Sequence, residues 1–229
     1  MAERLFYYPF PIVYIGEKSM NTFFFDFDGT LADSVPSYIK ALKRIMEHNG
    51  LGCSDETIKE TTTLGFIKLA EHLKNKYGIC YTKEKLLQEF DEVLHLEYEN
   101  NVTLKKGALA YIKSLKGSGK SVNILSAGQP RYILTVLKRY DIVDLFDHIL
   151  YCDSLGLTKS NPQIYLRAAE WVNAKLEDCC FFDDNIDAIQ AAVKAGIYTI
   201  GVYDKASEPY EEDIKATANR YIYHWDELL

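Results

Sequence analysis

Short apolar runs alternate with helical patterns from Asn21 to the end of the chain. The runs that predict strands are Thr22 to Phe27, Ser121 to Leu125, His148 to Tyr151, Cys179 to Phe182, Tyr198 to Val202 and a weaker Arg220 to Tyr223. Such alternation is typical of an α/β fold, a parallel sheet with helices on both faces. Polar or small residues follow each of the first five runs at once. Because ligands of open α/β sheets bind beyond the carboxyl ends of the strands, we expect the site there.

One long stretch interrupts the alternation. Residues 36–101 contain no convincing strand, but they show helical patterns over Tyr38 to His48, Gly65 to Tyr77 and Lys83 to Tyr98. An insertion directly after the loop of the first strand can lie over the carboxyl edge of the sheet as a lid. We therefore predict a core of residues 20–35 and 102–229, a helical cap domain of residues 36–101, and an N-terminal extension of unknown role in residues 1–19.

Composition excludes several classes of partner. The chain has 229 residues, with 26 Lys and Arg against 33 Asp and Glu, and a net charge of −7. It has no dense basic block, which argues against nucleic acid as a partner. No apolar run approaches the roughly 20 residues needed to cross a bilayer, so no membrane association is expected. The five cysteines are odd in number and form no CxxC pair, which predicts reduced core residues in a cytoplasmic protein.

Two carboxylates follow the first apolar run, in the segment FFFDFDGTLADS. On an extended chain Asp26 and Asp28 point to the same side, because side chains alternate with a period of two. Like charges at such proximity require a proton or a cation between them. Mg²⁺ is suited to the position, since carboxylates, waters and phosphate oxygens complete its octahedron. A carboxylate beside a bound phosphate can attack phosphorus, although a simple Asp-Gly turn is the alternative.

Two further strand ends carry groups that suit phosphate. Ser126 ends the second apolar run, and its hydroxyl together with the free amides of the following loop can bind a phosphate oxygen. Lys159 precedes Pro162, which is well placed to open a helix, by three residues. Its ammonium can reach back to a phosphate and to Asp26. Taken alone, a strand-end serine is usually part of a turn, and a loop lysine is usually solvated.

Two adjacent acids end the fourth run, in CCFFDDNIDAIQAAVKAG. Buried strands rarely end in two carboxylates unless a cation or backbone amides receive them. If these acids match a metal-binding motif, as the family resemblance given below implies, counting back from the helical pattern that ends at Gly196 makes Asp184 the main metal ligand with Asp183 beside it. The DxxxD spacing instead pairs Asp183 with Asp187, which we consider the weaker alternative. A helix N-cap at Asp184 or Asn185 explains part of the pattern equally well.

The four signals together resemble the motifs of the haloacid dehalogenase-like superfamily, and DGTLADSVPSY is especially similar to its phosphoglycolate-phosphatase-like branch. The resemblance covers the chain from Met20 onward and implies the strand order 3-2-1-4-5. It implies Asp26 as nucleophile, Asp28 as general acid and base, Ser126 and Lys159 as further catalytic residues, and Mg²⁺ as cofactor. The implied phosphate-binding set is Asp26, Gly29, Ser126, Ala127 and Lys159, and the implied metal-binding set is Asp26, Asp28, Asp183 and Asp184. Ser160 stands where the third motif usually has proline, which loosens that match.

The resemblance implies a magnesium-dependent phosphatase of a small phosphorylated metabolite, acting through an aspartyl-phosphate, as a monomer or homodimer. Two alternatives stay open: a phosphomutase of the β-phosphoglucomutase type, and a catalytically silent binding protein of the same fold. Substrate choice is expected in the cap, where Thr62, Thr63, Gly65 and Lys68 form the best candidate loop. A helix start with a solvated lysine explains that loop equally well.

Overall fold

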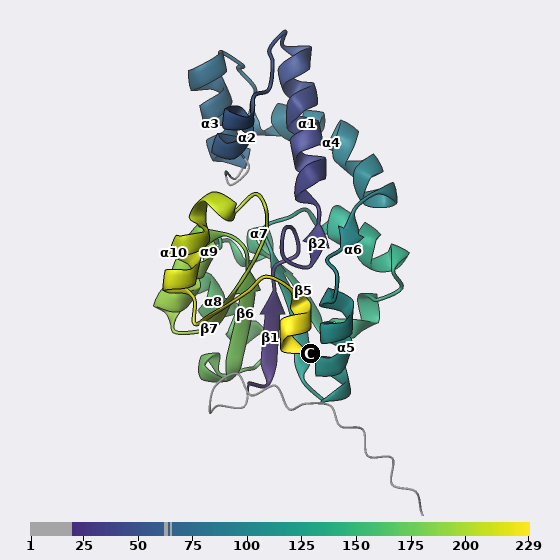
Figure 1. The fold of residues 1–229 in the computed structure, drawn as a ribbon, viewed down its shortest axis with the longest axis vertical. Helices are drawn as coiled ribbons and strands as arrows, with labels where there is room; N and C mark the ends of the chain where they lie inside the picture. Colours follow the sequence, from purple (N-terminus) through teal and green to yellow (C-terminus); the bar gives the residue numbers. More distant parts are fainter. Residues whose placement is uncertain (1–19, 62–63, 65) are drawn as a thin grey trace, which may run out of the picture.

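A six-stranded parallel sheet forms the centre of the molecule. The computed structural model describes residues 20–61, 64 and 66–229. The strands lie in the order β5-β4-β1-β6-β7-β8, and Figure 1 shows β1, β6 and β7 side by side. Their bounds are β1 (Thr22–Phe25), β4 (Ser121–Ser126), β5 (His148–Tyr151), β6 (Cys179–Asp183), β7 (Tyr198–Val202) and β8 (Arg220–Ile222). The predicted α/β class and the order 3-2-1-4-5 are confirmed, with β8 added at one edge.

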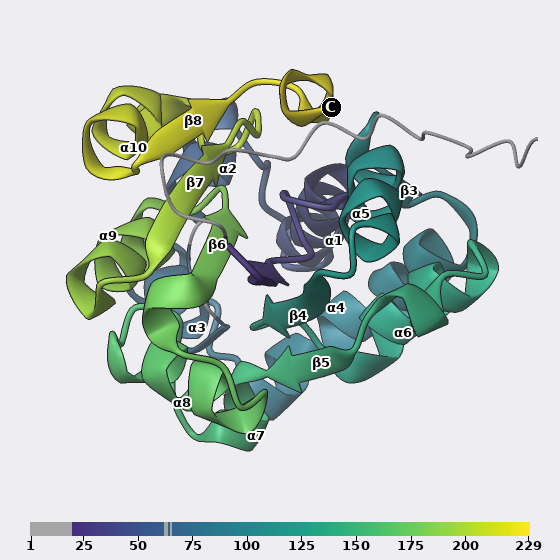
Figure 2. The same ribbon diagram turned by 90° about the horizontal axis from the view of Figure 1, so that it is seen from below.

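Helices cover both faces of the sheet because consecutive side chains of each strand point to opposite sides. Phe23 and Phe25 of β1 belong to one apolar cluster, and Phe24 belongs to the other. One face carries α5 (Ala108–Gly117), α6 (Pro130–Arg139) and the 3-10 helix η4 (Trp225–Leu228). The other carries α7 (Cys152–Leu155), α8 (Gln163–Trp171) and α9 (Ile186–Ala195), with α10 (Glu211–Thr217) beside α9 (Figure 2).

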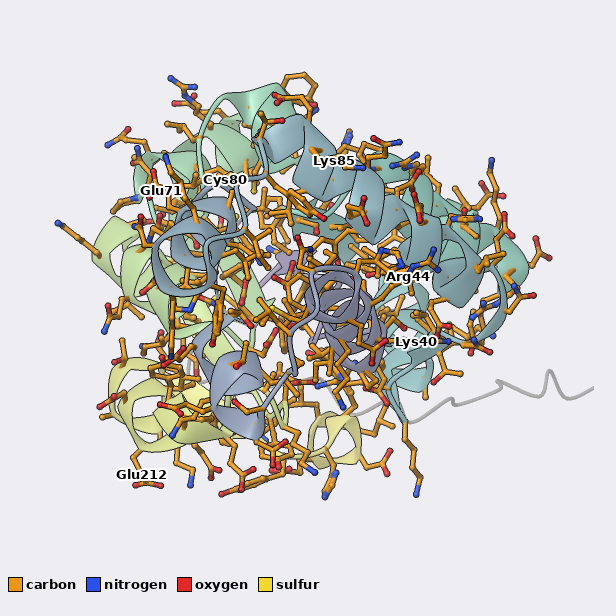
Figure 3. All side chains as sticks on the ribbon, turned by 90° about the horizontal axis from the view of Figure 1, so that it is seen from above. Lys40, Arg44, Glu71, Cys80, Lys85 and Glu212 are labelled. Carbon is orange, nitrogen blue, oxygen red and sulfur yellow. The ribbon has the colours of Figure 1, made fainter. Side chains whose placement is uncertain are left out.

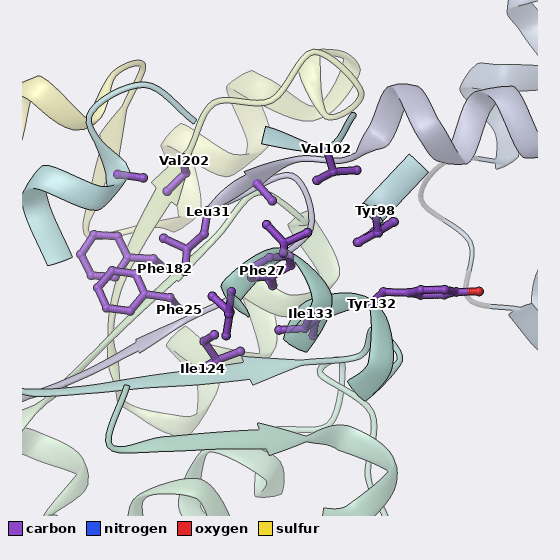
Figure 4. Close-up of a cluster of buried hydrophobic side chains, with 14 of the residues drawn as sticks. Phe25, Phe27, Leu31, Tyr98, Val102, Ile124, Tyr132, Ile133, Phe182 and Val202 are labelled. Atoms are coloured by element: carbon purple, nitrogen blue, oxygen red, sulfur yellow. The ribbon is translucent and has the colours of Figure 1, made fainter. Parts of the chain in front are cut away.

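Aromatic rings fill much of the first cluster. Phe25 stacks on Phe182 with 4.7 Å between ring centroids, and Tyr111 and Trp225 pack against both rings. Phe25 and Phe182 lie at one end of the cluster, with Tyr132 at the other (Figure 4). Burying a side chain of this size contributes about 1.5 to 3 kcal/mol. Because Phe25 and Phe182 directly precede Asp26 and Asp183, this end of the cluster supports the strand ends that carry the candidate site.

The helices described in the segment inserted after the first strand form the cap, at the carboxyl edge of the sheet (Figure 1). They are α1 (Val35–His48), α2 (Asp55–Thr61), α3 (Phe66–Tyr77) and α4 (Lys83–Asn100). The side-chain oxygen of Thr82 accepts a hydrogen bond from the Lys85 amide and so caps the start of α4. Helix α4 packs against α1 and also against α6 of the core.

The two chain segments that connect cap and core pair with each other. They are the two-residue strands β2 (Ala32–Asp33) and β3 (Thr103–Leu104), which run antiparallel. Neither strand was predicted, because two residues show no periodicity. Helix α2 was also missed, since seven residues complete too few turns for a clear apolar face.

Strand register aligns the candidate residues at one edge. Phe25 pairs with Ile124 of β4 on one side and with Phe182 of β6 on the other. Asp26, Ser126 and Asp183 therefore leave their strands at nearly the same level. The chain turns immediately after β1, where the amide of Leu31 donates to the carbonyl of Phe27. Consequently β1 ends at Phe25 rather than at the predicted Phe27.

The cysteines are free in all five positions, as predicted. Cys152, Cys179 and Cys180 are buried, whereas Cys53 is half-buried and Cys80 is exposed. The predicted core position is therefore wrong for Cys80, which lies in the connection between α3 and α4.

Within the described part of the chain, no helix is both long and apolar enough to cross a membrane.

Candidate active site

Lys159 joins the carboxylates of two strand ends. Its ammonium lies 2.8 Å from Oδ1 of Asp26 and 2.7 Å from Oδ2 of Asp183. All three side chains are largely buried, with Lys159 12% exposed. Burial opposes the charge on Lys159, but the two carboxylates outweigh it and hold the pKa of the ammonium well above its usual range. The sequence placed Lys159 near Asp26, and the structure brings them into contact.

Asp184 is held by two hydroxyl groups. Thr30 donates a hydrogen bond to its Oδ1 and Ser207 to its Oδ2, each at 2.9 Å. Burial, followed by the charges of Asp183 and Asp26, raises the pKa of the Asp184 carboxyl. Burial likewise raises the pKa of Asp183, although Lys159 opposes the shift. Burial is the largest cause of both shifts, and it disfavours the charged form of each carboxyl.

Asp26, Asp183 and Asp184 together form a group of carboxylates that fits a divalent cation. One oxygen from each lies within 4.8 Å of the others. Carboxylate oxygens are the hard donors that Mg²⁺ prefers, and a cation would offset the burial and the mutual repulsion that raise the pKa values of Asp183 and Asp184. The carboxylates of Asp28 and Asp187 are not part of this group.

Gly29 lets the chain pass close to this group. Its φ is +81°, and a Cβ placed on it would lie 2.7 Å from Oδ2 of Asp184. Both the conformation and the space require glycine at this position. Phosphate binding by Gly29 stays a prediction; what the structure shows is that this glycine makes room for the Asp184 carboxylate.

Asp28 lies next to the group formed by Asp26, Asp183 and Asp184, on the side that faces the cap. Ser34 donates a hydrogen bond of 2.7 Å to its Oδ1, and the hydroxyl of Tyr98 on α4 donates to the same oxygen. Burial and the charge of Asp26 raise the pKa of the Asp28 carboxyl, against the opposing effects of these two hydroxyl groups. A carboxyl with a raised pKa at this position can carry a proton for transfer.

Ser126 lies at the end of β4, directly before the loop that leads into α6. Its Oγ accepts a hydrogen bond of 2.9 Å from the amide of Gly128, and its side chain is buried. A Cβ on Gly128 would lie 2.6 Å from Oδ2 of Asp28. Ala127 is exposed and lines the cavity described below. The loop therefore presents small residues toward Asp28.

The hydrogen bonds at the start of helix α9 identify its N-cap residue. The side-chain oxygen of Asn185 accepts from the amides of Asp187 and Ala188, at 2.9 and 3.3 Å. Asn185 is therefore the N-cap, whereas Asp184 points its carboxylate toward Thr30 and Ser207. Asp187 is exposed in the first turn of the helix.

A cavity of about 290 Å³ lies between this cluster and the cap. Core residues that line it are Asp26, Asp28, Ser126, Ala127, Gly128, Gln129, Tyr132, Lys159, Asp184, Asn185, Ala206 and Ser207. The remaining lining residues, which lead into the cap or belong to it, are Ser34, Val35, Tyr38, Leu64, Leu94 and Tyr98. Thr62, Thr63 and Gly65 of the predicted cap loop lie outside the described residues. Lys68 is exposed and does not line the cavity.

Comparison with known proteins identifies the family. A family profile described as haloacid dehalogenase-like hydrolase matches residues 23–202. The chain belongs to the haloacid dehalogenase-like hydrolases. The matched range includes every residue of the site described above except Ala206 and Ser207.

Two bacterial relatives of this hydrolase are similar over most of their length. One is named phosphorylated carbohydrates phosphatase, from Thermotoga maritima; it is 27% identical over 185 residues, which cover 79% of this chain and 84% of the relative. The other is named phosphoglycolate phosphatase, from Psychrobacter arcticus; it is 24% identical over 190 residues, which cover 78% and 81%.

The fold also matches a solved structure of CbbY from Rhodobacter sphaeroides. The TM-score is 0.79 at 19% identity, with 91% of this hydrolase and 96% of that chain covered. That structure was solved with xylulose-(1,5)bisphosphate. At this identity the comparison supports the fold alone.

Several residues of the site were not singled out from the sequence. Thr30 directly follows Gly29 in the first motif, so its position in that motif could have indicated it. Ser34 and Tyr98 lie next to the cap boundaries, and Ser207 lies in a loop after β7 without a recognisable pattern. Only the folded chain brings these last three to the carboxylates.

Proposed function

We propose that this hydrolase is a phosphatase that releases phosphate from a small phosphorylated metabolite, with Asp26 as nucleophile. The observation that carries the proposal is the position of Asp26. It is buried at the end of the central strand, in contact with Lys159, and grouped with Asp183 and Asp184. The names of the two bacterial relatives, both phosphatases, support the same reaction class.

Magnesium is the cofactor we propose for the three grouped carboxylates. Asp26, Asp183 and Asp184 would hold it, with Asp184 positioned by Thr30 and Ser207. When bound, the ion supplies positive charge that neutralises phosphate oxygens. The exposed position of Asp187 favours Asp184 as the ligand of the two alternatives left open by the sequence.

Lys159 and the loop after β4 bind the phosphate oxygens in this proposal. Lys159 carries a fixed positive charge, and Ser126 with the amide of Ala127 offers hydrogen bonds at the start of α6. Preorganised donors of this kind stabilise charge that develops during phosphoryl transfer. They also hold phosphorus in line with a carboxylate oxygen of Asp26.

Asp26 forms a bond from its carboxylate oxygen to phosphorus as the bond from phosphorus to the alcohol oxygen breaks. Asp28 gives its proton to the departing alcohol, a role that burial and the charge of Asp26 favour because they raise the pKa of its carboxyl. Asp28 then takes a proton from water, and that water attacks phosphorus to release phosphate and restore Asp26. Ser34 and Tyr98 hold Asp28 between the phosphate position and the cap.

A phosphate-release assay with magnesium and with EDTA tests this proposal, using para-nitrophenyl phosphate and small phosphate esters. The Asp26→Asn protein is the blank. Release that requires magnesium and is absent from the blank is the expected result. Isomerisation of a hexose phosphate without release would show a mutase instead. Absence of turnover with every ester would show a protein that only binds.

The remaining features of the proposal concern location and organisation. We propose a cytoplasmic enzyme, in keeping with the five free cysteines. We also propose that residues 36–101 form the cap domain that closes over the substrate, and that residues 20–35 and 102–229 form the catalytic core.

A further inference from the structure

The cap side of the cavity presents no charged side chain among the described residues. Helices α1 and α4 contribute Val35, Tyr38, Leu94 and Tyr98, and the connection between α2 and α3 contributes Leu64. Tyr132 of α6 adjoins them. These six residues, which we call the neutral wall, surround the position that the alcohol part of a substrate would take in the proposed reaction.

The three tyrosines of the neutral wall have already donated their hydroxyl hydrogens. Tyr98 donates to Asp28, Tyr132 donates to Asp91 at 2.6 Å, and Tyr38 donates to the carbonyl of Thr61 at 3.4 Å. A tyrosine hydroxyl has a single hydrogen to donate, so each of these three oxygens can offer a ligand only its lone pairs. The wall thus offers acceptors. A substrate hydroxyl can donate to them, whereas a carboxylate has no hydrogen to give.

The cations of the cap lie on its outer surface. Lys40, Arg44 and Lys85 are labelled there in Figure 3, and their side chains are 64%, 44% and 45% exposed. Each is paired with a glutamate of α4, at 2.5 to 2.8 Å. Arg131 of the core packs over the ring of Tyr132, but it is paired with Asp91 at 2.8 Å.

Within the described lining of the cavity the cation is Lys159, and two carboxylates already engage it. A second negative group on a substrate, besides its phosphate, would therefore lie between the neutral wall and Asp28 without a positive partner. Gln129 adds only a neutral amide to the lining. An unpaired charge in a partly enclosed site costs more free energy than its contacts return.

We infer that the alcohol released by this enzyme is a small uncharged polyol or sugar, and that esters of hydroxy acids are poor substrates. The inference rests on the proposed phosphatase function and narrows its substrate class. Val35, Leu64 and Leu94 supply apolar surface for the carbon chain of such an alcohol. The volume of about 290 Å³ limits its size.

Paired esters test this inference directly. 2-Phosphoglycolate and 2-hydroxyethyl phosphate differ in whether a carboxylate or a hydroxymethyl group follows the same carbon, and 3-phosphoglycerate and glycerol 3-phosphate form a second pair. We expect kcat/KM to be at least about tenfold higher for the alcohol of each pair, because an uncompensated charge is rejected strongly. Equal or higher kcat/KM for the acids overturns the inference, while their magnesium-dependent hydrolysis leaves the phosphatase function standing.

A cation placed on the neutral wall should shift this preference. Leu94→Lys is expected to raise the acid-to-alcohol ratio of kcat/KM at least about tenfold, since it supplies the missing partner. Leu96→Lys is the matched control: Leu96 lies on the same helix but is 51% exposed and does not line the cavity. The acid-to-alcohol ratio of kcat/KM for Leu96→Lys should equal that of the wild type.

Val35→Lys, at a half-buried position of the wall, repeats the test if Leu94→Lys does not fold. Thermal melting identifies folded variants. An unchanged ratio in a folded wall variant overturns the inference. If neither the esters nor para-nitrophenyl phosphate is hydrolysed by the wild type with magnesium, the proposed function itself fails, and the inference fails with it.

Discussion

A substitution at Asp26 should change the rate of the reaction without changing the stability of the fold. The carboxylate of Asp26 shares Lys159 with Asp183, so an amide in its place leaves the lysine one charged partner. We predict that Asp26→Asn lowers kcat for phosphate release by at least about 10³-fold, because the variant lacks the proposed nucleophile. The melting temperature should change little. Initial rates and thermal melting measure the two effects, and a rate within tenfold of the wild type would contradict the assignment.

The choice between Asp184 and Asp187 as metal ligand can be made by binding alone. Asp184 lies in the carboxylate group, and Asp187 is exposed on α9. We predict that Asp184→Asn raises the Kd for Mg²⁺ at least about tenfold, whereas Asp187→Asn leaves it unchanged. Isothermal titration calorimetry with Mg²⁺ measures the Kd of each variant and requires no turnover. The reverse result would favour the DxxxD pairing.

Ser207 is expected to act through Asp184 rather than on the substrate. Its hydroxyl donates to Oδ2 of Asp184 at 2.9 Å and so fixes the orientation of the carboxylate. Groups that orient metal ligands typically affect affinity about 10- to 100-fold. We predict about tenfold weaker Mg²⁺ binding for Ser207→Ala, with kcat largely restored at saturating magnesium. Ser154→Ala, at an exposed position of α7, serves as the control. A lowered kcat that magnesium does not restore would indicate another role.

The loop after β4 depends on the small size of one residue. A Cβ on Gly128 would lie 2.6 Å from Oδ2 of Asp28 and 3.2 Å from Oγ of Ser126. We predict that Gly128→Ala lowers the free energy of unfolding by about 1 to 3 kcal/mol and also lowers kcat, because the loop or Asp28 must move.

Gly117→Ala is the comparison for that variant. Gly117 ends α5, and nothing lies within 4 Å of the position of an added Cβ. Alanine there should be neutral or slightly stabilising, since it lowers the entropy of the unfolded chain. Urea unfolding measures both proteins. Equal stability and activity of Gly128→Ala and the wild type would show that the loop has more room than the structure indicates.

The elements that could be predicted from the sequence are those with a clear period. Each predicted strand is present within about two residues, because strands buried on both faces read as continuous apolar runs. Helices α1, α3 and α4 were found through their apolar faces. The connection formed by β2 and β3 has no pattern of its own, since its pairing exists only when both ends of the cap return to the core.

The sequence could predict a site residue only where a reactive or charged side chain lies next to a recognisable strand or helix end. Asp26, Asp28, Ser126, Lys159, Asp183 and Asp184 all follow or precede recognisable elements, and all line or adjoin one cavity. Tyr98 and Ser207 reach the site from 70 and 23 residues away from the carboxylates that they contact. Contacts at such separations depend on the packing of cap and core, which a linear pattern does not contain.

At the scale of the whole molecule, the cap is tied to the core through the site itself. Tyr98 of α4 donates to Asp28, and its ring lies 4.9 Å from that of Tyr132 on α6. Asp91, two turns earlier on α4, accepts from Tyr132 and pairs with Arg131. These contacts form one side of the cavity, so the position of the cap and the shape of the substrate site are linked.

Asp91→Asn tests that link, because the amide weakens the pair with Arg131 but keeps the size of the side chain. Asp91 is 32% exposed, so we expect only about 0.5 to 1 kcal/mol of lost cap–core interaction. KM should therefore rise about two- to fivefold, and hydrogen exchange in α4 should quicken. Glu92→Gln breaks the neighbouring pair with Arg44, which joins α4 to α1 within the cap, and should change neither quantity. Because both variants remove one charge from adjacent positions of one helix, a difference between them isolates the cap–core contact. Identical behaviour would mean that this contact does not hold the cap over the substrate.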